Sequence, residues 1–357
     1  MANSYLTLSG TAGGSTTKFT KSIWLKRSNL TQGYITDNSG TDEVAMYFNS
    51  SDKLICFVWD GSAYSTELIT TRVFRDTSAW YHIVFAVDYT NSTQAQRARV
   101  YVNGVEETSF TTTTRPGNNT TTFDTYNSSK THYIGRTSGG SHYFDGYISH
   151  LAHVDGTQLS PTSFGETDST SGIWKFKSPS VSFGTKGYHL KFENSGNLGL
   201  DSSGNSNTFT VNGNLKQALD TPSNVYPTWN PLDNLSGHPA SFSNGNTTVS
   251  IPNSGGKFTS TLAVNSGKYY CEVKLNTLNS GVIGIQPIEN SPSVSFFDSG
   301  SNGIGLYGTG GTIYNNGSNI GSIASISNND IIGIALDLDN NNVYFSKNGQ
   351  YASGLSG

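Results

Sequence analysis

Residues 329–349 constrain the fold of this chain more than any other stretch. Apolar residues alternate with other residues from Ile332 to Leu338, and the alternation restarts at Val343 after a polar turn. An Asn-Gly pair at 348–349 then supplies the positive φ angles that a tight hairpin requires. This stretch predicts two strands, two turns and an antiparallel meander with one face packed on a core.

Composition extends the same interpretation to the whole chain. Its 357 residues exceed what one hydrophobic core usually organises, so we expect two domains. Only 13% of the residues are charged, and Gly, Ser, Thr and Asn are abundant where helices would need Ala, Leu, Glu and Lys. The 19 Tyr, 18 Phe and 5 Trp supply burial area that disordered chains lack. We expect an all-β protein with long polar loops.

Charge and hydropathy exclude several partners. The net charge is −4 and no run of Lys or Arg occurs, so the chain lacks the basic surface that nucleic-acid binding requires. No apolar run reaches the roughly 18 residues of a membrane span, and the first residues enter a strand pattern without a basic and apolar leader. We expect no nucleic-acid partner, no membrane insertion and no secretory export.

The two cysteines have different surroundings in the sequence but the same predicted state. Cys56 and Cys271 lie in different predicted domains, each inside an apolar strand pattern. Buried free thiols commonly occupy such positions. We therefore expect two buried free cysteines and no disulfide.

Residues 1–177 predict a first domain of strands joined by polar loops. Asp60-Gly61 and Asn103-Gly104 each separate two apolar runs, which is a strong hairpin signal. Aromatic and β-branched runs of strand length occur at 22–26, 44–48, 54–59, 80–87 and 99–102.

The order of these strands resembles the laminin-G-like branch of the concanavalin A-like jelly rolls. The marks of that branch are Trp-Tyr-His-Ile-Val-Phe at 80–85, Val-Tyr-Val-Asn-Gly at 100–104, Tyr-Ile-Gly-Arg at 133–136, Phe-Asp-Gly-Tyr-Ile-Ser-His-Leu-Ala at 144–152 and Leu-Ser-Pro at 159–161. The resemblance implies a β-sandwich.

Residues 178–230 predict a connector, because several prolines break any long element and leave two short strands near 188–192 and 209–211.

Residues 231–357 resemble a SPRY domain, through the 329–349 hairpin and earlier strands near 267–274, 282–285 and 303–307. A SPRY module binds and does not catalyse. Because such domains continue past the Lys-Asn-Gly hairpin, this one looks incomplete, and we expect either a longer chain or a neighbouring subunit to complete its sheet.

The order of the three parts resembles structural proteins of tailed bacteriophages, especially marine ones. The resemblance implies a component of the virion, such as a tail fibre, head fibre or similar appendage. It also implies other virion proteins as partners, assembly into a homo-oligomer, synthesis in the host cytoplasm and contact with host surface polysaccharide.

Catalytic motifs are weak in this sequence. Glycan hydrolases of the concanavalin A-like fold place paired carboxylates on one strand, and no such run is present. Glu166 and Asp168 form the nearest pair, in a Gly- and Ser-rich loop. We therefore expect no enzymatic activity, with a cryptic or degraded glycan hydrolase as the alternative and a purely structural oligomeric scaffold as a third possibility.

Calcium is the one cofactor that the sequence leaves open. Asp145, in a Phe-Asp-Gly turn, and Asp201, in an oxygen-rich turn, are the candidate ligands. Hydrogen-bonded turns of Asp and Ser explain the second segment equally well.

Aromatic residues in polar loops predict the sites of contact. Sugars require an aromatic face and a fixed set of polar groups for the hydroxyls. The side chains that meet this description lie in both domains and are Trp59, Asp60, Tyr64, His142, Tyr143, Phe296, Phe297, Asp298, Tyr314 and Asn315. Burial of the aromatics in the two cores is the competing interpretation, especially for Trp59.

Overall fold

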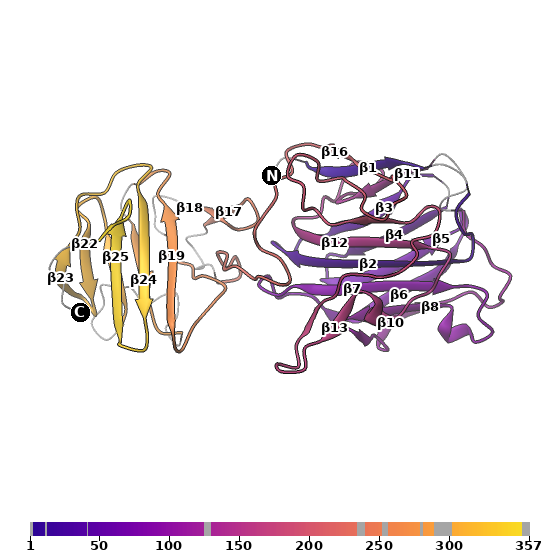
Figure 1. Ribbon diagram of the computed structural model, residues 1–357, viewed down its shortest axis with the longest axis horizontal. Coiled ribbons are helices and arrows are strands. Elements are labelled where there is room, and N and C mark those ends of the chain that lie inside the picture. Colours follow the sequence, from indigo (N-terminus) through magenta and orange to yellow (C-terminus); the bar gives the residue numbers. More distant parts are fainter. Residues whose placement is uncertain are drawn as a thin grey trace. The chain divides into compact units, whose positions relative to one another are not determined.

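The computed structural model describes residues 3–10, 13–40, 42–124, 130–233, 240–251, 256–278, 281–288 and 302–351. Contacts divide the chain into two compact units, Met1–Tyr226 and Pro227–Gly357. Both units consist of antiparallel strands (Figure 1), which confirms the all-β prediction. In the described part of the chain, no helix has the length and apolar character to span a membrane.

Two sheets and one small hairpin make up the first unit. The eight-stranded sheet has the order β10 (Phe110–Thr114), β6 (Tyr64–Val73), β5 (Lys53–Trp59), β4 (Glu43–Phe48), β3 (Gly33–Asn38), β11 (Thr131–Ile134), β1 (Tyr5–Ser9) and β16 (Thr210–Asn212). The six-stranded sheet has the order β15 (Tyr188–Leu190), β12 (Gly146–Asp155), β2 (Lys18–Arg27), β7 (Tyr81–Asp88), β8 (Ala98–Val102) and β9 (Val105–Glu106). Strands β13 (Gly165–Thr167) and β14 (Trp174–Phe176) form the hairpin, and the 3₁₀ turns are η1 (Gln94–Gln96) and η2 (Pro161–Ser163).

The core of the first unit lies between its two sheets. On β7 the inward residues Ile83, Phe85 and Val87 join this core, while Val84 and Ala86 point to the other face and pack with Phe164. The period of two follows from the pleat of a strand. Each large apolar side chain that is fully buried contributes roughly 1.5–3 kcal/mol to folding.

One cationic side chain is enclosed in this core. Lys21 of β2 is 3% exposed, and its Nζ lies 3.5 Å from the Thr36 hydroxyl. Burial lowers the pKa of Lys21 to about 8, although the nearby Asp37 carboxylate acts in the opposite direction. The folded state therefore holds the charged ammonium less well than water does.

Residues 178–226 belong to the first unit, so its boundary lies well beyond the expected residue 177. β15 pairs with β12, and β16 pairs with β1, so each sheet gains an edge strand from this segment. Leu190 and Phe209 are buried in the common core. The expected connector completes both sheets because its short strands carry apolar side chains that only this core can bury.

An ion pair fastens the end of the first unit to its second strand. Lys26 Nζ donates to Asp220 Oδ2 at 2.8 Å, and both side chains are at least 95% buried. Trp80 Nε1 donates to the other oxygen of Asp220 at 3.0 Å. A buried pair that loses one partner leaves an uncompensated charge, so the two side chains hold the 213–226 segment in place.

The second unit has two four-stranded sheets and a separate hairpin. One sheet has the order β19 (Lys268–Lys274), β24 (Ile331–Asp337), β25 (Asn342–Lys347) and β26 (Gln350–Tyr351). The other has the order β20 (Val282–Ile285), β21 (Ile304–Tyr307), β22 (Thr312–Asn315) and β23 (Ser318–Ser322), and β17 (Ser241–Ser243) pairs with β18 (Thr248–Ser250). Ile332, Ile334 and Phe345 of the first sheet pack with Leu306 and Ile313 of the second.

The hairpin at 329–349 has the expected form. Ile334 lies opposite Phe345, and Leu336 lies opposite Val343. Asn348 and Gly349 have φ angles of 49° and 80°, which place β26 beside β25. The alternating pattern therefore predicted the two strands and the tight turn, and the structure adds their register.

Cys271 differs from its prediction. Cys56 is buried and free as expected, whereas Cys271 is free but exposed. β19 pairs with β24 on one side and lies at the edge of its sheet among the described strands. Tyr269 and Tyr270 on the same strand are also exposed, at 48% and 53%. An apolar strand pattern predicts burial only when neighbouring strands cover the strand.

The position of the boundary predicts how fragments of the chain behave. A fragment of residues 1–226 should unfold in one cooperative thermal transition, since it contains every strand of both sheets. A fragment of residues 1–177 loses β15, β16 and the partner of Lys26, and should melt at a lower temperature or aggregate. Circular dichroism melting curves compare the two. Equal melting temperatures would show that residues 178–226 contribute nothing to the unit.

Replacement of the buried lysine should stabilise the protein at neutral pH. In the unfolded chain the pKa of Lys21 is near 10.5 and in the folded state it is about 8, so the charged ammonium destabilises the fold below pH 8. The difference corresponds to about 3 kcal/mol and fades as the pH rises from 8 to 10.5.

Lys21→Met should therefore raise the free energy of unfolding at pH 7, and the gain should shrink at pH 10. Lys216→Met, at an exposed position, is the control and should change neither value. Urea denaturation at the two pH values makes the measurement. A Lys21→Met variant less stable than the parent at pH 7 would contradict the assignment.

Candidate functional site

The outward side of the eight-stranded sheet is rich in aromatic residues. On β5, Leu54 and Cys56 point into the core, whereas Ile55, Phe57 and Trp59 point away from it. The side chains that share this outward side, called the aromatic face below, are Tyr34, Tyr47, Ile55, Phe57, Trp59, Tyr64 and Ile69. Both sides of the central strands are thus apolar, although only one of them meets the other sheet.

The rings of the aromatic face contact one another in a continuous row. Tyr34 and Tyr47 are stacked, with ring centroids 4.3 Å apart and an angle of 6°. Phe57 meets Tyr47 and Tyr64 edge-on at 6.2 and 5.3 Å, and Tyr64 meets Trp59 at 4.8 Å. Edge and offset contacts of this kind fix ring orientations. The row therefore presents a prearranged surface of ring faces and edges.

Two acidic residues lie beside the stacked tyrosines. Asp37 Oδ1 and Oδ2 accept hydrogen bonds from the backbone N–H groups of Asn38 (2.8 Å) and Ser138 (2.6 Å). Burial, and after it the hydrogen bond with Asp37, raises the pKa of Glu43 to about 8. The Glu43 carboxyl therefore holds its proton at neutral pH.

The tyrosine hydroxyls keep their protons on this face. Burial is the main reason that the pKa values of Tyr34, Tyr47 and Tyr64 are raised, and neighbouring acidic groups act in the same direction. The hydroxyls can therefore donate hydrogen bonds throughout the neutral range.

Asp60 shapes the loop that presents Tyr64. Its Oδ1 accepts hydrogen bonds from Ser62 N, Ser62 Oγ and Ala63 N at 2.8–2.9 Å. These bonds lower the pKa of Asp60, the largest effect being that of the Ala63 amide. The residue thus holds the turn between β5 and β6, which sets Tyr64 against Trp59.

His142 and Tyr143 extend the aromatic face at the β3 side. The His142 carbonyl accepts the Tyr34 N–H at 2.9 Å, and the two rings lie 6.2 Å apart. Tyr143 bridges Tyr34 through the backbone and lies 6.1 Å from the Tyr5 ring. The structure therefore brings together all five contact residues that the sequence predicted in the first domain: Trp59, Asp60, Tyr64, His142 and Tyr143.

The sequence interpretation missed the middle of the aromatic face. Tyr34, Tyr47, Phe57, Asp37 and Glu43 all lie inside strands, where aromatic residues predict a core. The available signal was the double apolar pattern of 54–59, in which both sides of one strand are apolar. Such a strand needs a cover on each side, or else one side is a binding surface.

The other predicted contact residues belong to the second unit. Tyr314 is half-buried on β22, with its ring 6.2 Å from that of Tyr307, and Asn315 is exposed at the end of the strand. Phe296, Phe297 and Asp298 lie outside the described residues. The described part of this unit also holds a row of three half-buried rings, in which Phe258 meets Trp229 and Phe242 edge-on at 5.1 and 5.6 Å. None of the contact residues predicted from the sequence belongs to that row.

Hydrogen bonds occupy both oxygens of Asp201 but only one oxygen of Asp145, whose Oδ1 is buried without a donor among the described residues. Asp201 accepts hydrogen bonds from the N–H groups of His189, Ser203 and Asn207 at 2.8–2.9 Å. A carboxylate with so many backbone donors stabilises the turn around it. Asp145 accepts Asn29 Nδ2, and burial raises its pKa. Within the described ranges, no three His, Cys, Asp or Glu side chains converge as a metal site would require.

Glu166 and Asp168 have a structural setting on the β13–β14 hairpin. Lys175 Nζ lies 3.5 Å from Glu166 and 3.0 Å from Asp168. Hydrogen bonds, chiefly from the Ser171 N–H, hold the pKa of Asp168 well below its usual range. A carboxylate with so low a pKa cannot act as a general acid near neutral pH.

A buried serine–histidine pair lies on the opposite sheet. Ser22 Oγ is 2.8 Å from His82 Nε2, and Trp174 Nε1 donates to His82 Nδ1 at 2.9 Å. Because the indole N–H can only donate, the proton of His82 sits on Nε2 and is donated to Ser22. Burial lowers the pKa of His82 to about 3. In this tautomer the histidine cannot act as the base that activates Ser22.

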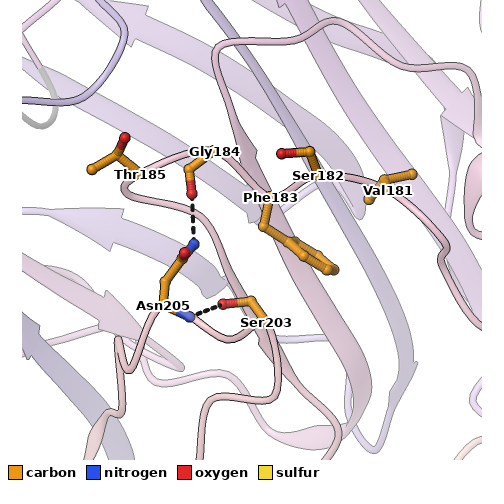
Figure 2. Close-up of a pocket in the computed structure, with 7 residues that line it drawn as sticks. All are labelled: Val181, Ser182, Phe183, Gly184, Thr185, Ser203 and Asn205. Carbon is orange, nitrogen blue, oxygen red and sulfur yellow. Dashed lines mark hydrogen bonds between the residues drawn. The ribbon is translucent and has the colours of Figure 1, made fainter.

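A hollow of about 640 Å³ lies elsewhere on the first unit (Figure 2). Asn205 Nδ2 donates to the Gly184 carbonyl at 2.6 Å, and Asn205 N donates to Ser203 Oγ at 3.2 Å. Phe183 is the one aromatic residue among those that line it, and its ring stacks on His189 at 5.7 Å. Its polar groups already pair with one another, so we place the candidate site on the aromatic face. The lining residues are Val181, Ser182, Phe183, Gly184, Thr185, Ser203 and Asn205.

Comparison with known proteins agrees with the architecture of the first unit. Residues 1–163 match a laminin G family model described as the concanavalin A-like lectin/glucanases superfamily. No curated protein matches the chain in sequence.

Several solved structures also match this chain. A heptameric SAP-like pentraxin from Limulus polyphemus is 19% identical, with 44% of this chain and 71% of the pentraxin covered and a TM-score of 0.33. A putative carbohydrate binding protein from Bacteroides ovatus is 20% identical, with 62% and 59% covered and a TM-score of 0.40. Domains LG4-5 of the mouse laminin alpha1 chain are 12% identical, with 98% and 74% covered and a TM-score of 0.36. Residues 1–163 of this chain are thus similar to the laminin G family of the concanavalin A-like superfamily.

Proposed function

We propose that this protein binds glycans on the aromatic face of its first unit. The observation that carries the proposal is the continuous row of rings from Tyr34 to Trp59, which lies on the side of the sheet that no other sheet of this unit covers. Phe57 is buried within the row, Tyr34, Tyr47 and Trp59 are half-buried, and Tyr64 is 42% exposed. Accessible aromatic rings that border one another are typical of a binding surface. The family that residues 1–163 match includes lectins by its description.

The polar groups on this face suit sugar hydroxyls. The tyrosine hydroxyls can donate, and the protonated Glu43 carboxyl can both donate and accept. Ring faces contact the apolar C–H side of a sugar, and fixed polar groups at their edges select its hydroxyl pattern. No cation is required for this mode of binding.

The same geometry favours binding over hydrolysis. Asp37 and Glu43 lie on neighbouring strands and are hydrogen-bonded to each other. Retaining glycosidases hold their two carboxyl groups about 5–5.5 Å apart and inverting ones about 6.5–9.5 Å apart, so that a sugar or a water molecule fits between them. Two carboxyl groups in direct hydrogen-bond contact leave no such space. We therefore propose that the protein has no glycosidase activity.

Truncation of the two rings at the Trp59 end of the row should weaken glycan retention. Tyr64→Ala and Trp59→Ala should each weaken binding to an immobilised glycan array by about tenfold or more, because aromatic anchors dominate such contacts. Tyr226→Ala is the matched control, since Tyr226 is 41% exposed and Tyr64 is 42% exposed, in the same unit. The bound glycans should release no reducing ends.

Two results would count against this proposal. Unchanged retention by folded Tyr64→Ala and Trp59→Ala variants would remove the aromatic face as the site. Release of reducing ends that is lost in an Asp37→Asn, Glu43→Gln variant would make the protein a hydrolase.

We further propose that the chain is an oligomeric component of a bacteriophage virion, such as a fibre or appendage. The support is the sequence resemblance of the laminin-G-like half, the 178–230 segment and the SPRY-like half to phage structural proteins. Many copies on one particle would convert weak single-site contacts with host polysaccharide into firm attachment. Mass spectrometry of purified virions should detect this protein at multiple copies per particle. Its absence from intact particles would contradict the assignment.

A further inference from the structure

Arg136 differs from every other arginine of the chain. The other six arginines each donate to a carboxylate or a backbone carbonyl: Arg27, Arg72, Arg75, Arg97, Arg99 and Arg115. Arg136 has no acceptor among the residues that the structure describes, and its Nε is buried without one. A guanidinium has five N–H donors and stays charged at every physiological pH, so this one is able to take an external acceptor.

Two rings hold the Arg136 guanidinium at one end of the aromatic face. Its central carbon lies 3.7 Å from the centroid of the Tyr5 ring and 4.8 Å from that of Tyr133. Cation–π contacts of this kind fix the plane of the guanidinium while leaving its N–H groups free to donate. The cation is therefore oriented without being neutralised.

The loop beside Arg136 leaves its outer nitrogen uncovered. A side-chain carbon on Gly140 would lie 3.2 Å from Arg136 Nη1, and Gly140 has a φ of +80°. Gly139 and Gly140 are both exposed. A residue with a side chain at Gly140 would be strained and would crowd this nitrogen, whereas glycine leaves an approach to it.

Arg136 also places a positive charge at the β1 end of the aromatic face. Glu43 lies on β4 and Glu67 on β6, whereas Arg136 follows β11 and contacts Tyr5 of β1. Asp37 of β3 lies nearer to Arg136, opposite Tyr133 of β11, and both its oxygens accept backbone N–H groups. Tyr143 lies between β3 and β1, since its backbone bridges Tyr34 of β3 and its ring centroid is 6.1 Å from that of Tyr5 on β1. A saccharide chain that runs along the rings therefore reaches a fixed cation at the β1 end.

We propose that Arg136 binds an anionic substituent, a carboxylate or a sulfate ester, of the glycan on the aromatic face. This inference rests on the proposed glycan binding and adds the class of glycan, namely acidic polysaccharide. The planar fork of the guanidinium matches the two oxygens of either group. Neutral saccharides would bind through the rings alone and more weakly.

The test uses the full chain and pairs of immobilised polysaccharides that differ only in the anionic group. Polygalacturonate is compared with its carboxyl-reduced form, and dextran sulfate with dextran, within an array that also contains acidic and neutral oligosaccharides. The parent should retain acidic members over their neutral counterparts. Arg136→Met should lose that preference by about tenfold or more, since a hydrogen bond to a charged group contributes about 1.5–3 kcal/mol.

Two further variants separate charge, geometry and folding. Arg136→Lys keeps a cation over the two rings but loses the planar fork, so it should retain only part of the preference and should melt like the parent. Arg99→Gln removes a positive charge from the opposite sheet and should keep the full preference. The carboxylate and sulfate pairs show which of the two anions is bound.

The outcomes distinguish this inference from the proposal on which it rests. If Trp59→Ala abolishes all retention while folded Arg136→Met and Arg136→Lys variants keep the acidic preference, the aromatic face binds glycans and the role of Arg136 is wrong. A parent that shows no acidic preference also overturns the inference. If the parent retains no glycan at all, both proposals fall.

Discussion

The alternation of side chains along β5 underlies both the stability and the proposed activity of the first unit. Leu54, Cys56 and Val58 point into the core. Phe57 and Trp59, which alternate with them along the strand, point to the other side of the sheet. Burial of the inward set contributes roughly 1.5–3 kcal/mol for each large side chain. In the outward set, Ile55 and Phe57 are only 4% and 5% exposed and form a second apolar cluster, so they also contribute to stability. Tyr64, which is 42% exposed, lies at the accessible end of this cluster.

The hydrophobic pattern predicted most of the architecture. The five strand runs of the first half and the hairpin at 329–349 appear where alternation and Asn-Gly or Asp-Gly turns placed them. The pattern did not predict strands that form only by pairing with residues distant in the sequence. β15 and β16 have three residues each, and their partners β12 and β1 lie far earlier in the chain, so local signals describe them as parts of a connector. The prediction that Cys271 is buried was wrong for a different reason. Its strand, β19, has no neighbouring strand on one side among the described residues.

The candidate site was predicted at its loops and missed at its centre. Trp59, Asp60, Tyr64, His142 and Tyr143 stand next to turn residues, where aromatic side chains are conspicuous. The central pair Tyr34 and Tyr47 becomes a stack only through the register of β3 with β4. The raised pKa of Glu43 likewise depends on that pairing, which sets it beside Asp37, and Asp37 is held by the Ser138 amide about a hundred residues away in sequence. Carboxylate motifs on a single strand cannot reveal such a pair.

A crystal structure of the full chain with an oligosaccharide that it retains tests the central claim most directly. The account predicts sugar rings over Tyr34, Tyr47 and Trp59, with their hydroxyls within hydrogen-bond distance of Glu43 or of the tyrosine hydroxyls. A saccharide bound instead in the hollow beside Asn205, or on the second unit, would contradict it.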